Sequence, residues 1–126
     1  MNKFFKKVRH GFTLVEIMIV VLIIGILLAI AVPNFIRARE SSRAKSCVAN
    51  LKQIDSGKEQ WAMDNKKTSA DTPAAADLYG ADKYVKSTPA CPASGTYTIA
   101  AVGTTPSCSK TNNGTAADTS DDHILP

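Results

Sequence analysis

The sequence has little of what catalysis or cofactor binding usually requires. It contains two histidines, His10 and His123, and three cysteines, Cys47, Cys91 and Cys108. It lacks a phosphate-binding glycine loop, paired catalytic carboxylates, and a cysteine and histidine at the short spacing of a nucleophile and its base. These absences argue against the common hydrolase and nucleotide-binding classes. The sequence therefore predicts a protein that is not an enzyme and has no cofactor.

Charge is nearly missing from one long stretch near the start of the chain. From Phe12 to Val32 only Thr13 and Glu16 are polar. These 21 residues would form a helix of about 31 Å, close to the ~30 Å hydrocarbon thickness of a bilayer. A helix is expected because a spanning segment must satisfy its own backbone hydrogen bonds. The stretch predicts a single membrane-spanning helix.

Glu16 is the unusual residue of this helix. An ionised carboxylate inside a bilayer costs about 2.5–3.5 kcal/mol or more unless it finds a partner. Another copy of the same segment is the nearest source of a partner, so the helix is predicted to be an assembly element. Gly25 and Ala29 have the small-x-x-x-small spacing that allows close approach of two helices.

The residues Gly11-Phe12-Thr13-Leu14-Val15-Glu16, followed by the apolar run, resemble the processing and methylation motif of type IV prepilins and type II secretion pseudopilins. The resemblance implies that a prepilin peptidase cuts after Gly11 and N-methylates Phe12, which leaves residues 12–126. It also implies that Glu16 meets the terminal amine of a neighbouring subunit. The implied partners are further copies in a homopolymer or mixed pilin fibre, the peptidase, and an inner-membrane assembly platform.

The implied function is that of a structural subunit of a type IV pilus or pseudopilus. The chain would be a single-pass protein of the bacterial inner membrane before assembly, and part of a periplasmic pseudopilus or extracellular pilus afterwards. One alternative is a type II secretion pseudopilin that acts in protein export. Another is a secretory signal peptide cut after Ala31, which would release a soluble domain of residues 32–126. The length of the apolar run and the position of Glu16 argue against a signal peptide.

The net charge of +4 and the pI near 9.1 belong mostly to the leader. Lys3, Lys6, Lys7 and Arg9 are four of the fifteen basic residues, so the chain from residue 12 has eleven basic and eleven acidic residues. The leader charges favour a cytoplasmic N-terminus. No more than weak nucleic-acid binding is expected from such a balanced chain.

Residues 34–67 change to an amphipathic pattern that predicts a helical stalk. An apolar stripe with a 3.6-residue period is formed by Ala44, Cys47, Val48, Leu51, Ile54 and Trp61. Charged residues, Lys58 among them, are expected on the other faces, and Gly57 is expected to be a soft point. Pro33 should bend a helix that continues through it. By resemblance to pilins, the helix between Gly25 and Pro33 is expected to lose regularity within a fibre.

The fold class predicted is α+β, with the long helix packed on a small C-terminal head. The divisions are residues 1–11 (leader), 12–33 (transmembrane and fibre-core helix), 34–67 (stalk) and 68–126 (head). Within the head, Thr72 is expected to cap a short helix through Tyr79. A strand is predicted at 96–102 with a return strand at 107–109, a polar loop at 110–122, and an end strand or clasp at 123–126.

The cysteines are expected to stabilise this small head. A disulfide between Cys91 and Cys108 is predicted, because it would bracket the hairpin and contribute about 3 kcal/mol through a loop of about 17 residues. The tail around these cysteines also resembles the tails of short pilin-like proteins. Cys47, on the apolar stripe, is predicted to be a buried free thiol. His123 beside Asp121 and Asp122 is a weak metal pattern, and no metal site is predicted.

Overall fold

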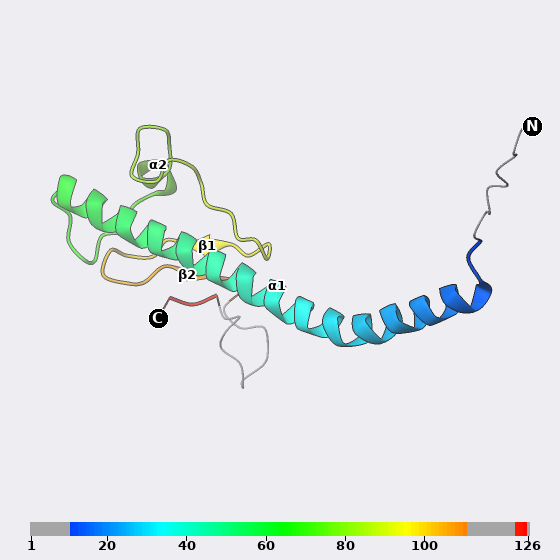
Figure 1. The fold of residues 1–126 in the computed structure, drawn as a ribbon. Helices are drawn as coiled ribbons and strands as arrows, with labels where there is room; N and C mark the ends of the chain where they lie inside the picture. The colour runs from blue at the N-terminus through cyan, green and yellow to red at the C-terminus, as the bar shows by residue number, and fades with distance from the viewer. Residues whose placement is uncertain (1–10, 111–122, 126) are drawn as a thin grey trace, which may run out of the picture. The chain divides into compact units, whose positions relative to one another are not determined.

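The computed structural model describes residues 11–110 and 123–125. The predicted leader, the polar loop and Pro126 therefore lie mostly or wholly outside the described residues. The described residues form two helices and two strands, in the order α1 (Leu14–Asp64), α2 (Ala75–Leu78), β1 (Tyr97–Thr98) and β2 (Ser107–Cys108) (Figure 1). One long apolar helix and one small strand pair agree with the predicted α+β class. The chain divides into two compact units, Met1–Ile36 and Arg37–Pro126.

In the first unit, the apolar residues of α1 are not buried by any other described part of the chain. An 18-residue window of α1 reaches a mean hydropathy of 3.2, and none of it is buried. The helix is therefore long and apolar enough to cross a membrane. It continues through Pro33. Because proline has no N–H, the carbonyl of Ala29 lacks its usual helical donor at this point.

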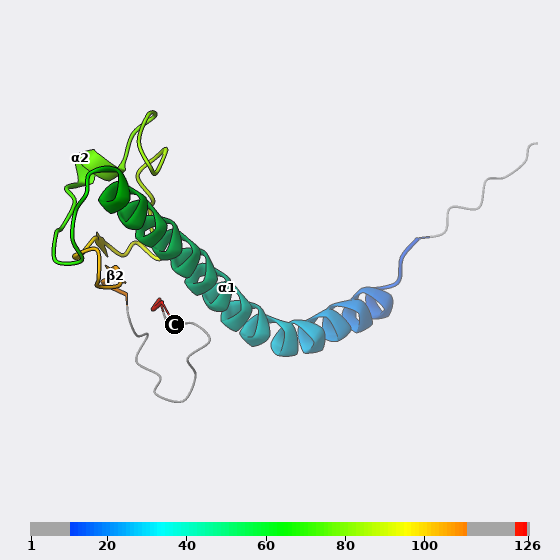
Figure 2. The same ribbon diagram turned by 90° about the vertical axis from the view of Figure 1, so that its left-hand side faces the viewer.

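In the second unit, the remainder of α1 supports the head. Figures 1 and 2 both show α2 and the β1–β2 pair lying along this part of the helix. The buried positions of α1 are Ala44, Cys47, Leu51, Ile54, Gly57, Lys58 and Ala62. Ala44, Cys47, Leu51 and Ile54 confirm the predicted stripe, whereas Val48 and Trp61 are only partly covered. The expectation that Lys58 lies on an outer face is wrong.

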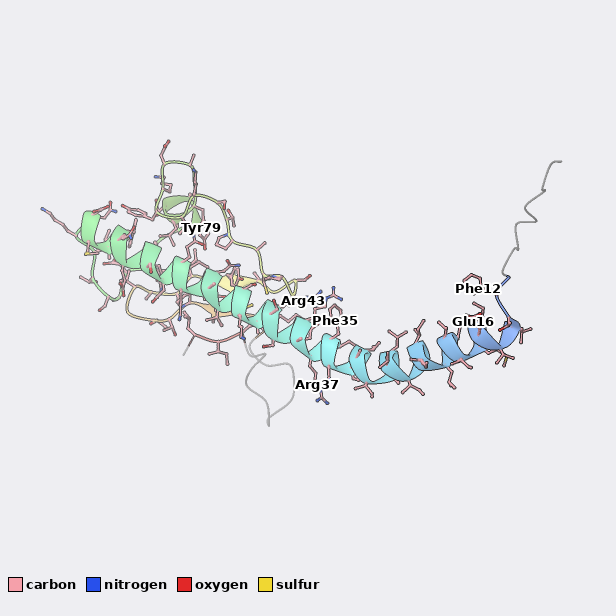
Figure 3. The ribbon with its side chains drawn as sticks, in the orientation of Figure 1. Phe12, Glu16, Phe35, Arg37, Arg43 and Tyr79 are labelled. Atoms are coloured by element: carbon pink, nitrogen blue, oxygen red, sulfur yellow. The ribbon has the colours of Figure 1, made fainter. Side chains whose placement is uncertain are left out.

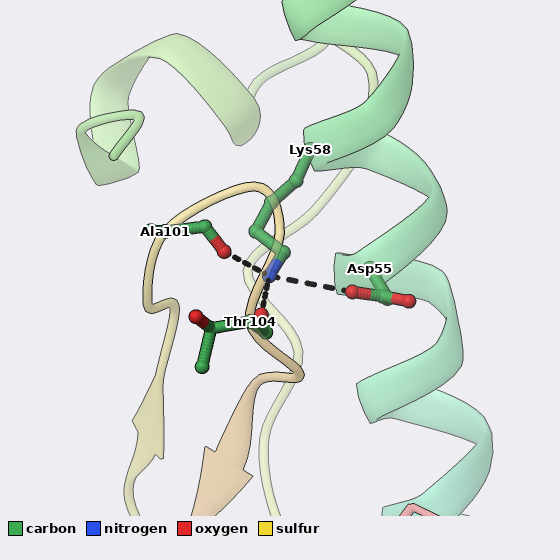
Figure 4. Close-up of polar contacts among 4 residues, drawn as sticks. All are labelled: Asp55, Lys58, Ala101 and Thr104. Atoms are coloured by element: carbon green, nitrogen blue, oxygen red, sulfur yellow. Dashed lines mark hydrogen bonds and ion pairs between the residues drawn. The ribbon is translucent and has the colours of Figure 1, made fainter. Parts of the chain in front are cut away.

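Lys58 is completely buried because the head provides oxygen atoms for its ammonium group. Its Nζ donates to the carbonyl of Ala101 at 3.0 Å and to the carbonyl of Thr104. It also lies 3.3 Å from Oδ1 of Asp55, one turn earlier on α1 (Figure 4). A buried ammonium group is tolerated when its three donors are satisfied. Lys58 thus fastens the 101–104 turn to the helix.

Gly57 is a site of close packing, which the sequence pattern does not indicate. A Cβ placed at Gly57 would lie 2.9 Å from Cγ2 of Val85. Val85 is itself fully buried and forms a parallel bridge with Tyr79. The short extended piece around Val85 therefore packs directly against the helix backbone at Gly57.

The short helix of the head is smaller than predicted. α2 begins at Ala75, and its N-cap is Ala74 instead of Thr72. The Asp77 carboxylate accepts the backbone N–H of Ala74 at 3.2 Å. This bond satisfies the N–H of Ala74, a donor that the side chain of Thr72 was expected to cap.

The β-hairpin is also shorter than the predicted strand at 96–102. β1 and β2 pair antiparallel with Tyr97 opposite Cys108 and Thr98 opposite Ser107, which confirms the predicted return strand. Ala100 has a φ of 56°, a left-handed conformation that ends the strand. Beyond it, Val102 and Gly103 donate their backbone N–H groups to the carbonyls of Asp71 and Ser69, at 3.0 and 2.8 Å. The loop between β1 and β2 therefore pairs with the segment that follows α1.

Candidate functional site

The beginning of α1 is built around Thr13 and Glu16. The N–H of Glu16 donates to Oγ1 of Thr13 at 3.2 Å, and the N–H of Thr13 points to Oε2 of Glu16 at 3.5 Å. This reciprocal pair is a capping box, in which the side chains at the N-cap and N3 positions satisfy free helix donors. The Thr-x-x-Glu spacing is visible in the sequence, and it gives Glu16 a role within its own chain besides the expected intermolecular one. Figure 3 shows Phe12 and Glu16 at this end of the helix.

Large apolar side chains are exposed along the described part of the first unit, from Phe12 to Ile36. Their exposed fractions range from 46% at Val20 to 83% at Phe12. A surface of this extent is unfavourable in water and indicates contact with lipid or with other protein. A Cβ added at Gly11 or Gly25 would meet no atom of the described residues within 4 Å. Among the described residues, no neighbouring side chain requires glycine at either position.

The second notable site is a buried cluster of sulfur and nitrogen atoms in the head. It consists of Cys47 on α1, Cys91 in the loop before the hairpin, Cys108 on β2, and His123 in the C-terminal segment. The ligand atoms of these four side chains all lie within 4.8 Å of one another, and all four residues are buried. They are all the thiols and the only imidazole in the sequence from residue 12 to residue 126.

The distances within this cluster are not those of a disulfide. Sγ of Cys91 lies 3.8 Å from Sγ of Cys108 and 3.7 Å from Nδ1 of His123. An S–S bond is about 2.05 Å long. The structure therefore does not show the predicted Cys91–Cys108 disulfide, and that pairing stays a prediction.

Polar groups surround the sulfur atoms. Burial raises the pKa of the Cys47 thiol to about 12, against the opposing effect of a hydrogen bond from Tyr97. Burial also raises the pKa of Tyr97, whose hydroxyl accepts a hydrogen bond from Nδ2 of Asn50 at 3.0 Å. At Cys91, burial acts to raise the pKa, but hydrogen bonding by the backbone at Ala93 and Gly95 and by the Cys108 and Cys47 side chains together lowers it.

Gly95 and a neighbouring cavity complete the surroundings. A Cβ at Gly95 would lie 2.6 Å from Sγ of Cys108 and 3.2 Å from Sγ of Cys91, so only glycine leaves room for both sulfur atoms. His123 borders an open cavity of about 470 Å³. The cavity is also lined by Glu40, Arg43, Pro92, Ala93, Ser94 and Lys110.

The sequence patterns do not group these four residues. The sequence predicts a disulfide between Cys91 and Cys108, a free thiol at Cys47, and His123 beside its acidic neighbours. The expected docking of the C-terminus is confirmed at His123, which is buried, and at Leu125, which packs against the core. One signal in the sequence does point to the cluster, because Cys47 lies on the helix stripe that faces the head.

Comparison with known proteins matches the family described as the prokaryotic N-terminal methylation motif to residues 6–32. Competence protein ComGC of Bacillus subtilis is 35% identical over 84 residues, which cover 67% of this chain and 82% of that protein. Type II secretion system core protein G of Klebsiella michiganensis is 28% identical over 107 residues, 75% of each chain.

Type IV major pilin protein PilA of Myxococcus xanthus is 43% identical over 61 residues, but these make up only 28% of that protein and 48% of this chain. No solved structure matches. The motif at the start of α1, the exposed apolar helix and the extended similarity to these relatives agree with one another. The chain belongs to the pilin and pseudopilin family.

Proposed function

We propose that this chain is a non-enzymatic fibre subunit that polymerises through the first unit of α1. The observation that carries the proposal is the exposed apolar helix of Leu14 to Ile36, whose first turn holds Glu16 in a capping box with Thr13. Burying apolar surface contributes roughly 25 cal/mol per Å². The same surface can therefore hold the subunit in a membrane first and hold it against sister helices afterwards.

Processing after Gly11 would convert the membrane precursor into the fibre subunit. Phe12 is 83% exposed, so the bond between Gly11 and Phe12 is open to a peptidase. Cleavage there removes the basic leader and creates an amine at Phe12, within the segment that matches the methylation motif. The products are a leader of residues 1–11 and a subunit of residues 12–126.

Glu16 would pair with the new amine of a neighbouring subunit. Within one chain, the contact from the N–H of Thr13 to the Glu16 carboxylate is a weak one of 3.5 Å. The carboxylate can therefore accept a stronger, charge-assisted bond from an ammonium group. Loss of this bond would leave an unpaired carboxylate among apolar helices.

Two substitutions test the processing step against the signal-peptide alternative. Gly11→Ala should leave the precursor uncut in the membrane fraction, whereas Ala31→Leu should be processed normally. In wild-type fibres, mass spectrometry should find an N-terminal peptide that begins at a singly methylated Phe12. A mature chain beginning at Val32, blocked by Ala31→Leu, would contradict the proposal, because a signal peptidase needs small residues before its cut.

A pseudopilus is the second candidate, and the extent of the similarity favours it. The match to core protein G covers 75% of each chain, whereas the match to the major pilin covers 28% of that protein. A pseudopilin would remain in a periplasmic fibre that serves protein export. Electron microscopy of material sheared from cells separates the two: surface fibres that contain this chain indicate a pilus, and their absence with loss of an exported protein on deletion indicates a pseudopilus.

A further inference from the structure

The buried cluster of Cys47, Cys91, Cys108 and His123 has the composition of a metal site. Three thiols and one imidazole come from four separate segments and place their ligand atoms within 4.8 Å of one another. Three cysteines and one histidine are an established ligand set for structural zinc, and thiolates select soft and borderline metals. We propose that these four residues bind one Zn²⁺ ion that holds the head together.

Two distances within the cluster fit the edges of a tetrahedron around zinc. Zn–S bonds of about 2.3 Å place two sulfur ligands about 3.8 Å apart, and a Zn–N bond near 2.0 Å places sulfur and nitrogen about 3.5 Å apart. The observed values are 3.8 Å for Cys91 Sγ to Cys108 Sγ and 3.7 Å for Cys91 Sγ to His123 Nδ1. The side chains thus surround a volume suited to a small ion.

Zinc accounts for residues that a disulfide leaves unexplained. A Cys91–Cys108 bond would use two members of the cluster and leave Cys47 and His123 buried beside it. His123 is only 6% exposed, and its Nδ1 faces sulfur. Four protein ligands with no exposed position make a closed site, which is typical of a structural ion and not of a catalytic one.

Groups around the cluster are placed to support bound thiolates. Tyr97 and Ala93 pack against the core that holds the three cysteines, and the Tyr97 hydroxyl accepts a hydrogen bond from Nδ2 of Asn50 at 3.0 Å. Hydrogen bonding by Tyr97 acts to lower the pKa of Cys47, and hydrogen bonding by the backbone at Ala93 and Gly95 acts to lower the pKa of Cys91. Such outer hydrogen bonds orient metal ligands and tune them. Gly95 has no room for a side chain against Cys108 and Cys91.

The charge of the site is also compensated nearby. Binding Zn²⁺ displaces three thiol protons to solvent and changes no oxidation state, which leaves a net charge of −1 on the ion with three thiolates and neutral imidazole. Arg43, Lys110 and Glu40 line the cavity that His123 borders, and Arg43 pairs with Glu40 at 3.0 Å, so these three side chains together contribute a charge of +1. This net positive charge reduces the cost of a negative site close to the surface.

The ion would join four segments that lie far apart in the sequence. Cys47 belongs to α1, Cys91 to the loop before the hairpin, Cys108 to β2 and His123 to the C-terminal segment. A small head cannot bury a large core and commonly relies on a metal or disulfide. One zinc would therefore fix the hairpin and the C-terminus to the helix together.

The test uses the full-length chain, purified in detergent under reducing conditions and loaded with Zn²⁺, with metal content measured by mass spectrometry. The wild type should retain one zinc per chain after removal of free metal. Replacement by Co²⁺ should give the absorption bands of a tetrahedral thiolate site. Tyr97→Phe should weaken the zinc affinity about 10-fold, as expected for loss of an outer hydrogen bond.

Substitutions at His123 separate ligation from a role in packing. His123→Ala should lose stoichiometric zinc, whereas His123→Cys should keep it with a Co²⁺ spectrum shifted toward four thiolates. Ile124→Ala, at an exposed neighbour without a ligand atom, is the matched control and should keep one zinc. The proposal is overturned if the loaded wild type holds no zinc, if peptide mapping finds a Cys91–Cys108 disulfide in it, or if His123→Ala binds as well as wild type.

Discussion

Nζ of Lys58 lies 3.3 Å from Oδ1 of Asp55, and the two side chains differ sharply in exposure. The Lys58 side chain is completely buried, whereas the Asp55 side chain is 33% exposed. The ammonium group is therefore directed toward the carbonyls of Ala101 and Thr104, and the partly exposed Asp55 carboxylate forms an ion pair with it. This arrangement makes one lysine the main polar link between α1 and the 101–104 turn of the head.

Lys58→Met should lower the free energy of unfolding of the head by about 3 kcal/mol, because it leaves the partly buried carbonyl hydrogen bonds of Ala101 and Thr104 unmade and the Asp55 carboxylate without its partner. Denaturant titration of the full chain in detergent, followed by the fluorescence of Trp61, measures this change. Lys52→Met is the matched control on the same helix, where Lys52 is exposed, and should change stability by less than about 0.5 kcal/mol. Equal stability of Lys58→Met and Lys52→Met would contradict the role given to Lys58.

Gly57→Ala should destabilise the head even though alanine is the better helix former by about 1 kcal/mol. The added methyl group would lie 2.9 Å from Cγ2 of Val85, and overpacking of this kind costs about 1–3 kcal/mol. The same Trp61 titration applies. In a Val85→Ala background the clash is removed, so Gly57→Ala should lower the free energy of unfolding by less than it does in the wild type. If the effects of the two single substitutions simply add in the double variant, the clash is not the cause.

The stabilisation that the Asp71 carboxylate gives to the head should be lost in acid. Its carboxylate accepts the N–H and the hydroxyl of Thr68 at 2.8 and 2.9 Å, and these bonds lower the pKa of Asp71. A lowered pKa in the folded state stabilises at neutral pH, and this contribution is lost as pH falls through the lowered value. The stability difference between wild type and Asp71→Asn should therefore shrink on acidification. Thr68→Ala should also lower the stability at neutral pH, but by less, because the backbone N–H of residue 68 still donates to Asp71. A stability difference between wild type and Asp71→Asn that does not change with pH would contradict this role of Asp71.

Local features could be predicted from the sequence, and contacts between distant segments could not. The apolar run and the 3.6-residue stripe are properties of neighbouring residues, so the long helix and the role of Cys47 and Leu51 in the core followed from them. Lys58 was misplaced because its partners are backbone carbonyls 43 and 46 residues away. Nothing in a charge pattern indicates such acceptors.

The hairpin and the cysteine cluster show the same limit. The β-branched residues of 96–102 favoured a long strand, but the left-handed Ala100 turns the chain so that Ala101 and Thr104 reach Lys58. The proximity of Cys91 to Cys108 could be predicted from the hairpin alone. Adding Cys47 and His123 required the docking of α1 and of the C-terminal segment, which spacing along the chain does not encode.

The capping box at the start of α1 allows the two roles of Glu16 to be separated. Thr13→Val removes the Oγ1 acceptor, which should weaken the first turn by about 1 kcal/mol while keeping the carboxylate. If pairing between subunits is the main role of Glu16, Thr13→Val should still assemble, as measured by its recovery in sheared fibres. Glu59→Gln, at an exposed carboxylate farther along α1, is the matched control for loss of one charge.

The most direct measurement is the fraction of the chain recovered in assembled fibres, surface or periplasmic, relative to the membrane for Glu16→Val. Glu16→Val should insert into the membrane and be processed normally, but its fibres should be strongly reduced, because the valine side chain cannot accept a hydrogen bond from the amine of the neighbouring Phe12. Wild-type recovery of Glu16→Val in fibres would contradict the account.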